Sequence, residues 1–150
     1  MTVIVRPAID ADIESVALIE QSSFSDPWPR PGFEPLVRAP RCMFIVAEEA
    51  PSEGVAGYSV ARWVEDEAEL LNIAVADEQR GKGIGGVMLD HVVRGLEERG
   101  IRHIFLEVRD SNTAARELYR SRGFRELSRR AGYYQRPTED AIVLAWRRGG

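Results

Sequence analysis

A glycine-rich run is the strongest chemical feature of the sequence. It extends from Gln79 to Gly86 (QRGKGIGG), after an apolar stretch at 70–75 and at the start of a segment with helical spacing. Glycines let backbone N–H groups approach a ligand closely, and the first turn of a helix adds unsatisfied N–H groups and a partial positive charge. The run therefore predicts a site for a phosphate or pyrophosphate, to which Arg80 and Lys82 would add charge. A glycine-rich turn that binds no ligand is the alternative interpretation.

Two common phosphate-binding motifs fit this run poorly. A P-loop has Ser or Thr directly after its Gly-Lys pair, whereas Gly83 follows Lys82 here. Gly81, Gly83 and Gly86 match the letters of the dinucleotide-binding pattern, but only one strand–helix–strand unit surrounds them. The acidic residue that this pattern places about 20 positions later is not at a strand end.

One carboxylate and one phenol are placed for acid–base chemistry. Glu107 lies in the alternating segment 103–108, where the period of a strand puts it on the face opposite to the aliphatic side chains. Asn112 and Tyr119 are seven residues apart on a predicted helix, which is close to two turns, so they share a face. Asn112 is at the helix start, where it could cap the helix or bind a ligand.

Both groups also have structural interpretations. Glu107 could be a carboxylate exposed on a sheet face, or one paired with Arg109. Tyr119 could be an aromatic that packs under the sheet with Leu118 and Phe124.

Strand and helix signals alternate along the chain and predict an α/β sandwich with a mixed sheet. The predicted strands cover 2–6, 43–48, 54–63, 69–75, 103–108, 124–130 and 141–146, with a turn at 51–53. Predicted helices cover 84–99 and 112–122, and an earlier helix is capped by Asp10. The apolar side of that first helix is predicted to hold Ile13, Val16, Ala17, Leu18 and Ile19. Glu20 is predicted to face away from this side or to end the helix.

Five prolines interrupt the segment Ser25–Pro40, and Trp28 and Phe33 lie among them. Prolines this dense predict an irregular loop or short helical turns. A loop of this length in a small domain is often functional.

Composition narrows the class of protein. A chain of 150 residues with 44% apolar and 29% charged residues fits one globular domain. The net charge of −4 argues against a general nucleic-acid binder. It divides into −9 over residues 1–100 and +5 over residues 101–150. An acidic part could meet a cationic substrate and a basic part an anionic one, although both could be solvated surface.

The sequence gives no sign of a secreted, membrane or metal-binding protein. Cys42 is the single cysteine, in an apolar segment, so no intrachain disulfide can form and we expect a small core residue. We expect no signal peptide and no membrane span, hence a cytoplasmic protein. His91 and His103 are interpreted as structural, and without a Cys/His cluster we expect no metal.

Several motifs, in order, resemble the GNAT superfamily of acetyl-CoA-dependent N-acetyltransferases. Residues 80–85 (RGKGIG) match its R/Q-x-x-G-x-G/A signature, and residues 112–124 match its later motif, N-x-x-A-x-x-L-Y-x-x-x-G-F. The runs 69–75 (ELLNIAV), 106–109 (LEVR), 133–134 (YY) and 139–142 (EDAI) narrow the resemblance to the RimI type, which acetylates the N-terminal alanine of a ribosomal protein. The prolines of 29–40 depart from that type and leave substrate selectivity open.

The resemblance implies a fold and a set of roles. The fold would be a mixed, mostly antiparallel sheet flanked by helices on both faces, in a single domain over 1–150. Glu107 would be the general base, through water or directly, and Tyr119 the acid that protonates the departing thiolate. A strand whose backbone groups are free would bind pantetheine and the thioester oxygen. The implied acetyl-CoA-binding residues are Ile73, Ala74, Val75, Arg80, Gly81, Lys82, Gly83, Ile84, Gly85, Gly86, Asn112 and Tyr119.

The acceptor site is less well marked. Trp28, Glu67, Tyr133 and Tyr134 are the candidates, because aromatic side chains can wall a peptide groove and an acidic group suits a cationic N-terminus. Each could also be ordinary surface or core. We expect acetyl transfer to a protein N-terminus, in the first place that of a ribosomal protein. We expect the protein to be a monomer or weak dimer with no metal, nucleic-acid or membrane partner. A lysine side chain or small amine as acceptor, and a non-catalytic acyl-CoA-binding module, are the alternatives.

Overall fold

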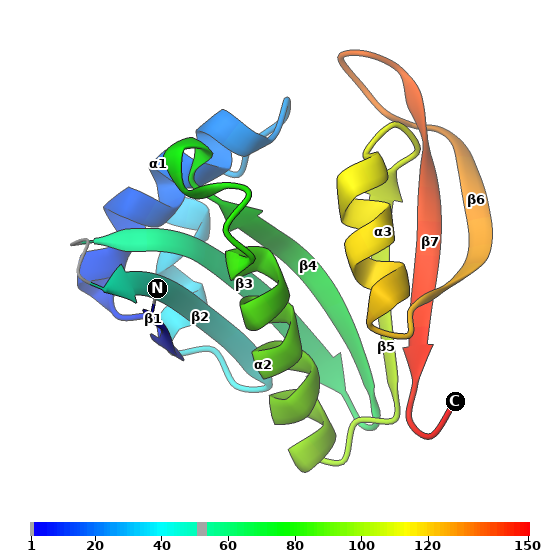
Figure 1. Ribbon diagram of the computed structural model, residues 1–150, viewed down its shortest axis with the longest axis horizontal. Coiled ribbons are helices and arrows are strands. Elements are labelled where there is room, and N and C mark those ends of the chain that lie inside the picture. Colours follow the sequence, from blue (N-terminus) through cyan, green and yellow to red (C-terminus); the bar gives the residue numbers. More distant parts are fainter. Residues whose placement is uncertain (1, 51–53) are drawn as a thin grey trace.

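Seven strands form one sheet within residues 2–50 and 54–150, the part of the chain that the computed structural model describes. Their order is β1-β2-β3-β4-β5-β7-β6, and all neighbours are antiparallel except β4 and β5 (Figure 1). The strands are β1 (Thr2–Pro7), β2 (Cys42–Ala50), β3 (Val55–Val64), β4 (Glu67–Val75), β5 (His103–Arg109), β6 (Arg125–Tyr134) and β7 (Glu139–Arg147). The predicted mixed, mostly antiparallel sheet is confirmed, while the predicted turn at 51–53 lies outside the described residues.

Helices cover both faces of the sheet, as predicted. The helix α1 (Ile13–Ser23) lies on one face, and α2 (Ile84–Glu98) and α3 (Thr113–Ser121) lie on the other (Figure 1). Short 3-10 helices connect them: η1 (Asp10–Asp12), η2 (Arg30–Gly32), η3 (Glu34–Val37) and η4 (Asp77–Gln79). Each face has its own apolar core, so the sheet is buried on two sides.

The Pro-rich segment forms the short helical turns η2 and η3, in agreement with the sequence. Its Phe33 is fully buried, with ring centroids 5.7 Å from Tyr58 and 6.0 Å from Phe44. Burying a phenylalanine stabilises the fold by about 1.5–3 kcal/mol. The ring of Trp28 packs on Phe33 at 5.4 Å, so this segment is part of the core on the α1 side.

The predicted apolar side of the first helix is wrong at two positions. Leu18 is 62% exposed, whereas Glu20 is 1% exposed. Residues spaced at i, i+3, i+4 and i+7 share a helix face, and this spacing joins Glu20 to Ile13, Val16 and Ala17. The 3-10 helix η1 directly precedes α1, and Asp10 in η1 pairs with Arg38 at 2.6 Å instead of capping α1.

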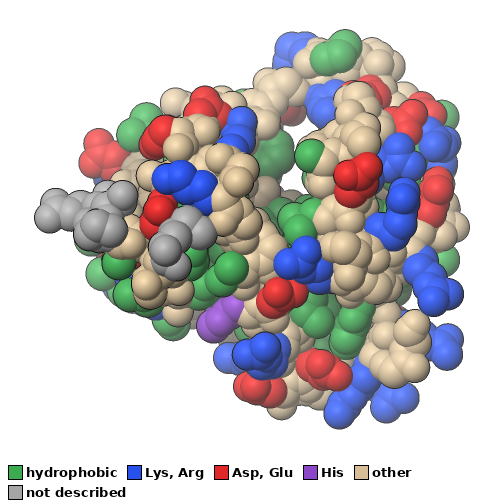
Figure 2. Space-filling view, in the orientation of Figure 1, with side chains coloured by type: hydrophobic (Ala, Val, Ile, Leu, Met, Phe, Trp, Pro, Cys, Tyr) green, Lys and Arg blue, Asp and Glu red, His purple; other side chains and the backbone are tan. Residues whose placement is uncertain are grey.

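The two parallel strands β4 and β5 pair only at their beginnings. Their register runs from Glu67 opposite His103 to Glu69 opposite Phe105 and then stops. In the next part of β4 the pairing with β3 skips one residue, because Val60 faces Asn72 while Ala61 faces Leu70. Such a bulge bends a strand and changes its twist. Beyond it the two strands diverge (Figure 1), and the space-filling view shows an opening between the halves that carry them (Figure 2).

Candidate active site

The glycine-rich turn lies where η4 leads into α2. Gly81 and Gly83 have φ angles of 81° and 82°, which L side chains rarely adopt, and Gly83 is the N-cap of α2. A Cβ added at either position would meet no atom within 4 Å. The turn therefore presents bare backbone and the first N–H groups of α2 to open space, which suits a diphosphate.

The charged side chains of this turn already have partners. Arg80 pairs with Asp77 at 2.7 Å and donates to the carbonyl oxygen of Val75 at 3.0 Å. Lys82 pairs with Glu49 at 3.1 Å. An anion bound to the turn would thus meet free backbone N–H groups, while the two nearby cations, Arg80 and Lys82, are already paired with carboxylates.

The first turn of α2 is closely packed against α3. A Cβ on Gly86 would lie 2.4 Å from the guanidinium of Arg122, and one on Gly85 would lie 3.6 Å from Leu118 and 3.8 Å from Val75. These glycines bring the start of α2 close to both α3 and the end of β4. Ile73, Ala74 and Val75, the predicted backbone-binding residues, form that end of β4, beyond its last pairing with β5.

Glu107 lies on the face of β5 opposite to the buried Leu106 and Val108, as its alternation predicted. Its carboxylate pairs with Arg130 of β6 at 2.6 Å, so the alternative pairing with Arg109 is wrong. The Arg130 guanidinium also covers the ring of Tyr133 at 4.2 Å. The nearby negative charge of Glu107 is the main reason that the pKa of Tyr133 is raised.

Arg109 instead joins three segments around the same face. It donates to Ser25 Oγ at 2.7 Å and to the carbonyl oxygen of Gln135 at 2.8 Å, and it pairs with Glu139 at 3.2 Å. It also covers the ring of Tyr134 at 4.5 Å. The segment after α1 and the β6–β7 connection are thereby held together beside Glu107.

Tyr119 lies on the other side of β5, in the core shared by α2 and α3. It is 6% exposed, and its ring centroid is 5.7 Å from that of Phe124. Burial raises the pKa of its phenol well above the ordinary value, and the charge of Tyr134 raises it further. Asn112 accepts a hydrogen bond from the backbone N–H of Ala115 at 3.2 Å and caps α3, as predicted.

The structure brings most of the predicted site residues to the end of the sheet where β4 and β5 diverge. Burial raises the pKa of Tyr134 to about 12, and the nearby negative charge of Glu107 raises it further. Glu67 is not brought to them, because it is opposite His103 at the start of β4, roughly 26 Å along the strand from Val75 at about 3.3 Å per residue.

Sequence reasoning missed four residues at or near this site: Glu20, Ser25, Arg109 and Arg130. Only Glu20 had a usable signal, which is its place on the apolar stripe of α1. The contacts of the others join segments 23 to 84 residues apart, and no short motif reveals such pairs.

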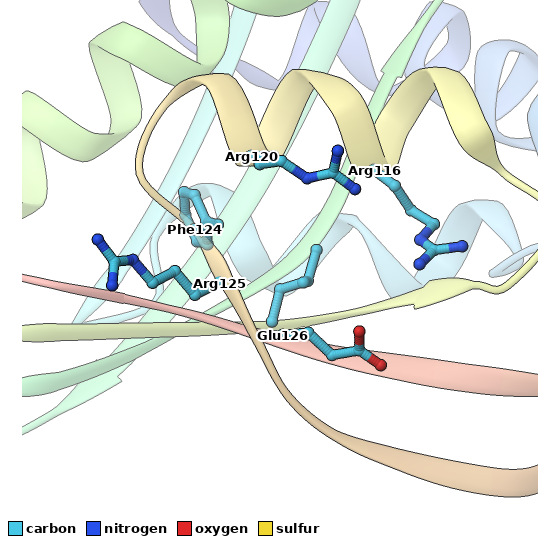
Figure 3. A pocket seen from close by; sticks show the side chains of 6 residues that line it. Arg116, Arg120, Phe124, Arg125 and Glu126 are labelled. Atoms are coloured by element: carbon cyan, nitrogen blue, oxygen red, sulfur yellow. The ribbon is translucent and has the colours of Figure 1, made fainter.

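A second hollow lies away from this site, between α3, β6 and β7 (Figure 3). It is lined by Arg116, Arg120, Phe124, Arg125, Glu126 and Leu144. None of the predicted site residues lines it, and Arg116 is paired with Asp110 at 3.1 Å. The described residues contain no group of three or more His, Cys, Asp or Glu that could hold a metal. In the same ranges no helix is long and apolar enough to cross a membrane.

Comparison with known proteins places these features in context. Residues 13–124 match the acetyltransferase (GNAT) family. The chain is 36% identical over 138 residues to the [ribosomal protein bS18]-alanine N-acetyltransferase of Escherichia coli K12, covering 89% of this chain and 90% of that protein. The crystal structure of the ribosomal-protein-S18-alanine N-acetyltransferase from Escherichia coli superposes with a TM-score of 0.88 at 32% identity, covering 97% and 94% of the two chains. Arabidopsis thaliana NAA60 in complex with acetyl-CoA shares the fold, with a TM-score of 0.88 at 20% identity over 99% and 100% of the chains.

Proposed function

We propose that this chain, which belongs to the acetyltransferase (GNAT) family, moves an acetyl group from acetyl-CoA to the N-terminal α-amine of a protein. The N-terminal alanine of a small-subunit ribosomal protein is the acceptor that we propose, because the relatives at 32–36% identity are named for that activity. One observation carries the chemistry. At the end of the sheet where β4 and β5 diverge, a carboxylate, Glu107, lies on one face of β5, and a buried phenol, Tyr119 of α3, lies on the other face.

Acetyl-CoA is the donor substrate in this proposal. The bare backbone at Gly81 and Gly83 and the N-terminus of α2 would bind its diphosphate, as their open geometry allows. The free edge of β4 at Ile73–Val75 would hold the pantetheine and direct a backbone N–H at the thioester oxygen. Asn112 caps the start of α3, the helix that carries Tyr119.

Glu107 would remove a proton from the attacking amine. A free α-amine has a pKa of about 7.7–8.0, so much of it is protonated at neutral pH and a carboxylate can accept its proton through a water molecule. The Arg130 partner is 53% exposed at its side chain, so it can leave the carboxylate without breaking a buried contact. The C–N bond then forms as the C–S bond breaks.

Tyr119 would give its proton to the departing thiolate. Because burial raises its pKa, the phenol keeps its proton over the whole range in which the amine titrates. No hydrogen bond joins its hydroxyl to another residue in 2–50 and 54–150, and no fully buried polar side-chain atom in these ranges lacks a partner, so the hydroxyl is not sealed in the core and its proton is not committed to a structural bond.

The acceptor would enter on the face that carries Glu107. Tyr133, Tyr134 and Trp28 would flank the peptide, with the segment after α1 tied to the β6–β7 connection through Arg109 and Ser25. Glu67 is left out of this site because it lies at the other end of β4.

A thiol-release assay with acetyl-CoA and a peptide panel tests the proposal. We expect peptides that begin with Ala to be acetylated fastest, and peptides that begin with bulky residues to react slowly. Polyamines that react as fast as the Ala peptides would indicate a small-amine acetyltransferase, and no turnover of any amine would indicate a non-catalytic module.

A further inference from the structure

Glu20 is a fully buried carboxylate that the proposed chemistry does not use. It is 1% exposed, and its two oxygens serve different partners. Oε1 accepts hydrogen bonds from the Tyr58 hydroxyl and, at 2.7 Å, from Asn72 Nδ2, while Oε2 accepts one from the backbone N–H of Trp28 at 2.9 Å. No Lys or Arg of the described residues is among these partners, so three neutral donors hold the carboxyl group. A buried polar group is costly unless its hydrogen bonds are made, so this network is what allows Glu20 to lie in the core.

The bulge in β4 is what brings Asn72 to this network. Before the bulge, Ala68 and Leu70 belong to the core on the α2 side. After it, Ala74 belongs to the core on the α1 side, and Asn72 lies on that side with it. The extra residue shifts the alternation by one position and so turns Asn72 toward Glu20, just beyond the last pairing of β4 with β5.

The Trp28 segment is held by an inner and an outer set of contacts. The outer contacts are Arg109 with Ser25 at 2.7 Å and Arg136 with Asp26 at 3.1 Å, and both are exposed to solvent. Exposed pairs of this kind contribute little to fixing a chain in place. The inner contacts are the packing of the Trp28 ring on Phe33 at 5.4 Å and the hydrogen bond from the Trp28 N–H to Glu20 at 2.9 Å. Of the two, only the hydrogen bond fixes the backbone of Trp28 directly, and a hydrogen bond is stronger in a buried setting than in water.

We propose that Glu20 is a positioning residue that fixes the Trp28 segment relative to β4, and so sets the distance between the acceptor and the thioester. The inference rests on the proposed function, because it takes Trp28 as part of the acceptor site. Glu20 touches neither substrate. It connects α1 to the strand that would hold the donor, through Asn72, and to the loop that would hold the acceptor, through the hydrogen bond from the Trp28 N–H.

Two substitutions separate the contacts of Glu20. Glu20→Met keeps a side chain of similar length and removes both acceptor oxygens, so the Trp28 N–H, the Tyr58 hydroxyl and Asn72 all lose their partner. Glu20→Gln keeps one acceptor oxygen and should act in the same direction with a smaller effect. Val16→Ala is the matched control, because Val16 is fully buried on the same face of α1 and makes no polar contact in this network.

Steady-state kinetics and binding give the first test, well below the melting temperature of each variant. Glu20→Met should raise KM for an Ala-starting peptide roughly tenfold or more, because the Trp28 segment loses its buried hydrogen bond and binding of the peptide must then order that segment. The affinity for acetyl-CoA should stay within about twofold of the parent, since the Gly81–Gly86 turn is untouched. Val16→Ala should lower the melting temperature and leave KM unchanged.

A second measurement needs no activity. In a background with Trp63→Phe and Trp146→Phe, Trp28 is the only tryptophan, and its quenching by acrylamide reports its exposure. Glu20→Met should increase the quenching of Trp28, and Val16→Ala should not. If Glu20→Met does not fold, the same two measurements on Glu20→Gln decide the question.

Unchanged KM and unchanged quenching in the folded Glu20 variant would overturn the proposal, as would equal changes in Val16→Ala. If the parent acetylates no peptide, the proposed function fails while the quenching experiment still decides whether Glu20 positions Trp28.

Discussion

Replacing Tyr119 by phenylalanine should separate the catalytic interpretation of this residue from the packing one. The ring is 6% exposed and packs on Phe124 at 5.7 Å, and phenylalanine keeps that ring. No hydrogen bond joins the hydroxyl to another side chain or backbone group within the described ranges, where every fully buried polar side-chain atom has a partner, so its removal leaves no partner unsatisfied. We therefore expect the free energy of unfolding to change by less than about 1 kcal/mol, a shift in melting temperature of no more than roughly 2–4 °C.

The effect on turnover should be much larger. A positioned acid typically contributes 10²–10⁴-fold, so kcat should fall by about two to four orders of magnitude, or about 3–5 kcal/mol of activation free energy. Because burial raises the pKa of Tyr119, the parent keeps this proton up to at least about pH 10, the ordinary value for tyrosine. The loss should therefore be the same at every pH between about 6 and 9.

The assay is a pH–rate profile of Tyr119→Phe beside the parent, with melting temperatures measured with and without acetyl-CoA. An unchanged acetyl-CoA-induced shift shows that the donor site is intact. A variant that turns over within about threefold of the parent across this range lacks the loss expected for a missing acid, and Tyr119 would then be a packing residue.

Three further outcomes follow from the same geometry. Glu107→Gln should lose most activity below the amine pKa of about 7.7–8.0 and less above it. Arg130→Gln breaks the same 2.6 Å ion pair but keeps the carboxylate, so it should remain active at low pH. Equal pH–rate profiles of the two variants would contradict the role of Glu107 as base. Gly83→Val should abolish the rise in melting temperature that acetyl-CoA causes. Gly100→Val is equally strained, at φ 86° at the other end of α2, and should lower the melting temperature but keep the rise caused by acetyl-CoA. A normal rise in both variants would show that the donor binds elsewhere. Burial raises the pKa of Tyr58, so its ionisation favours the unfolded chain above about pH 10. Tyr58→Phe should therefore lessen the fall of the unfolding free energy with pH by about 1.4 kcal/mol per pH unit. Urea titrations at pH 9 to 11 in which the unfolding free energies of parent and variant fall equally with pH would contradict this.

Local patterns were sufficient where the cause of the structure is local. The alternation of 103–108 gave both the strand and the side of Glu107, and the glycine turn and the Asn112 cap are where their residue types predict. Each of these depends on contacts within a few residues, which a single sequence contains.

The strand β6 shows where such patterns stop. Only Tyr134, of its ten residues, is even partly buried, so no apolar alternation marks its length, and the predicted strand ended at residue 130 instead of 134. Its irregular register with β7, which skips residues after Glu126 and after Arg130, decides that Arg130 reaches Glu107. That register comes from the folded sheet and not from any pattern in the segment.

Glu20 shows a different limit. The helical spacing placed it on the buried face, but a carboxylate in an apolar stripe is normally excluded from the core. Its burial depends on donors 8, 38 and 52 residues further along the chain, one in the segment after α1 and the others in β3 and β4. The exposed Leu18 is the opposite case, because an apolar side chain on the surface costs little free energy and is common in folded proteins.

The central claim is that the acceptor is a free N-terminal amine. Its most direct test is a pair of peptides with the same sequence, starting with Ala and containing one internal Lys, of which one has a blocked N-terminus. After reaction with acetyl-CoA, fragmentation by mass spectrometry locates the acetyl group. We expect one acetyl group on the α-amine of the free peptide, and no product from the blocked one. Acetylated Lys formed at equal rates in both peptides would contradict the account and identify a lysine acetyltransferase.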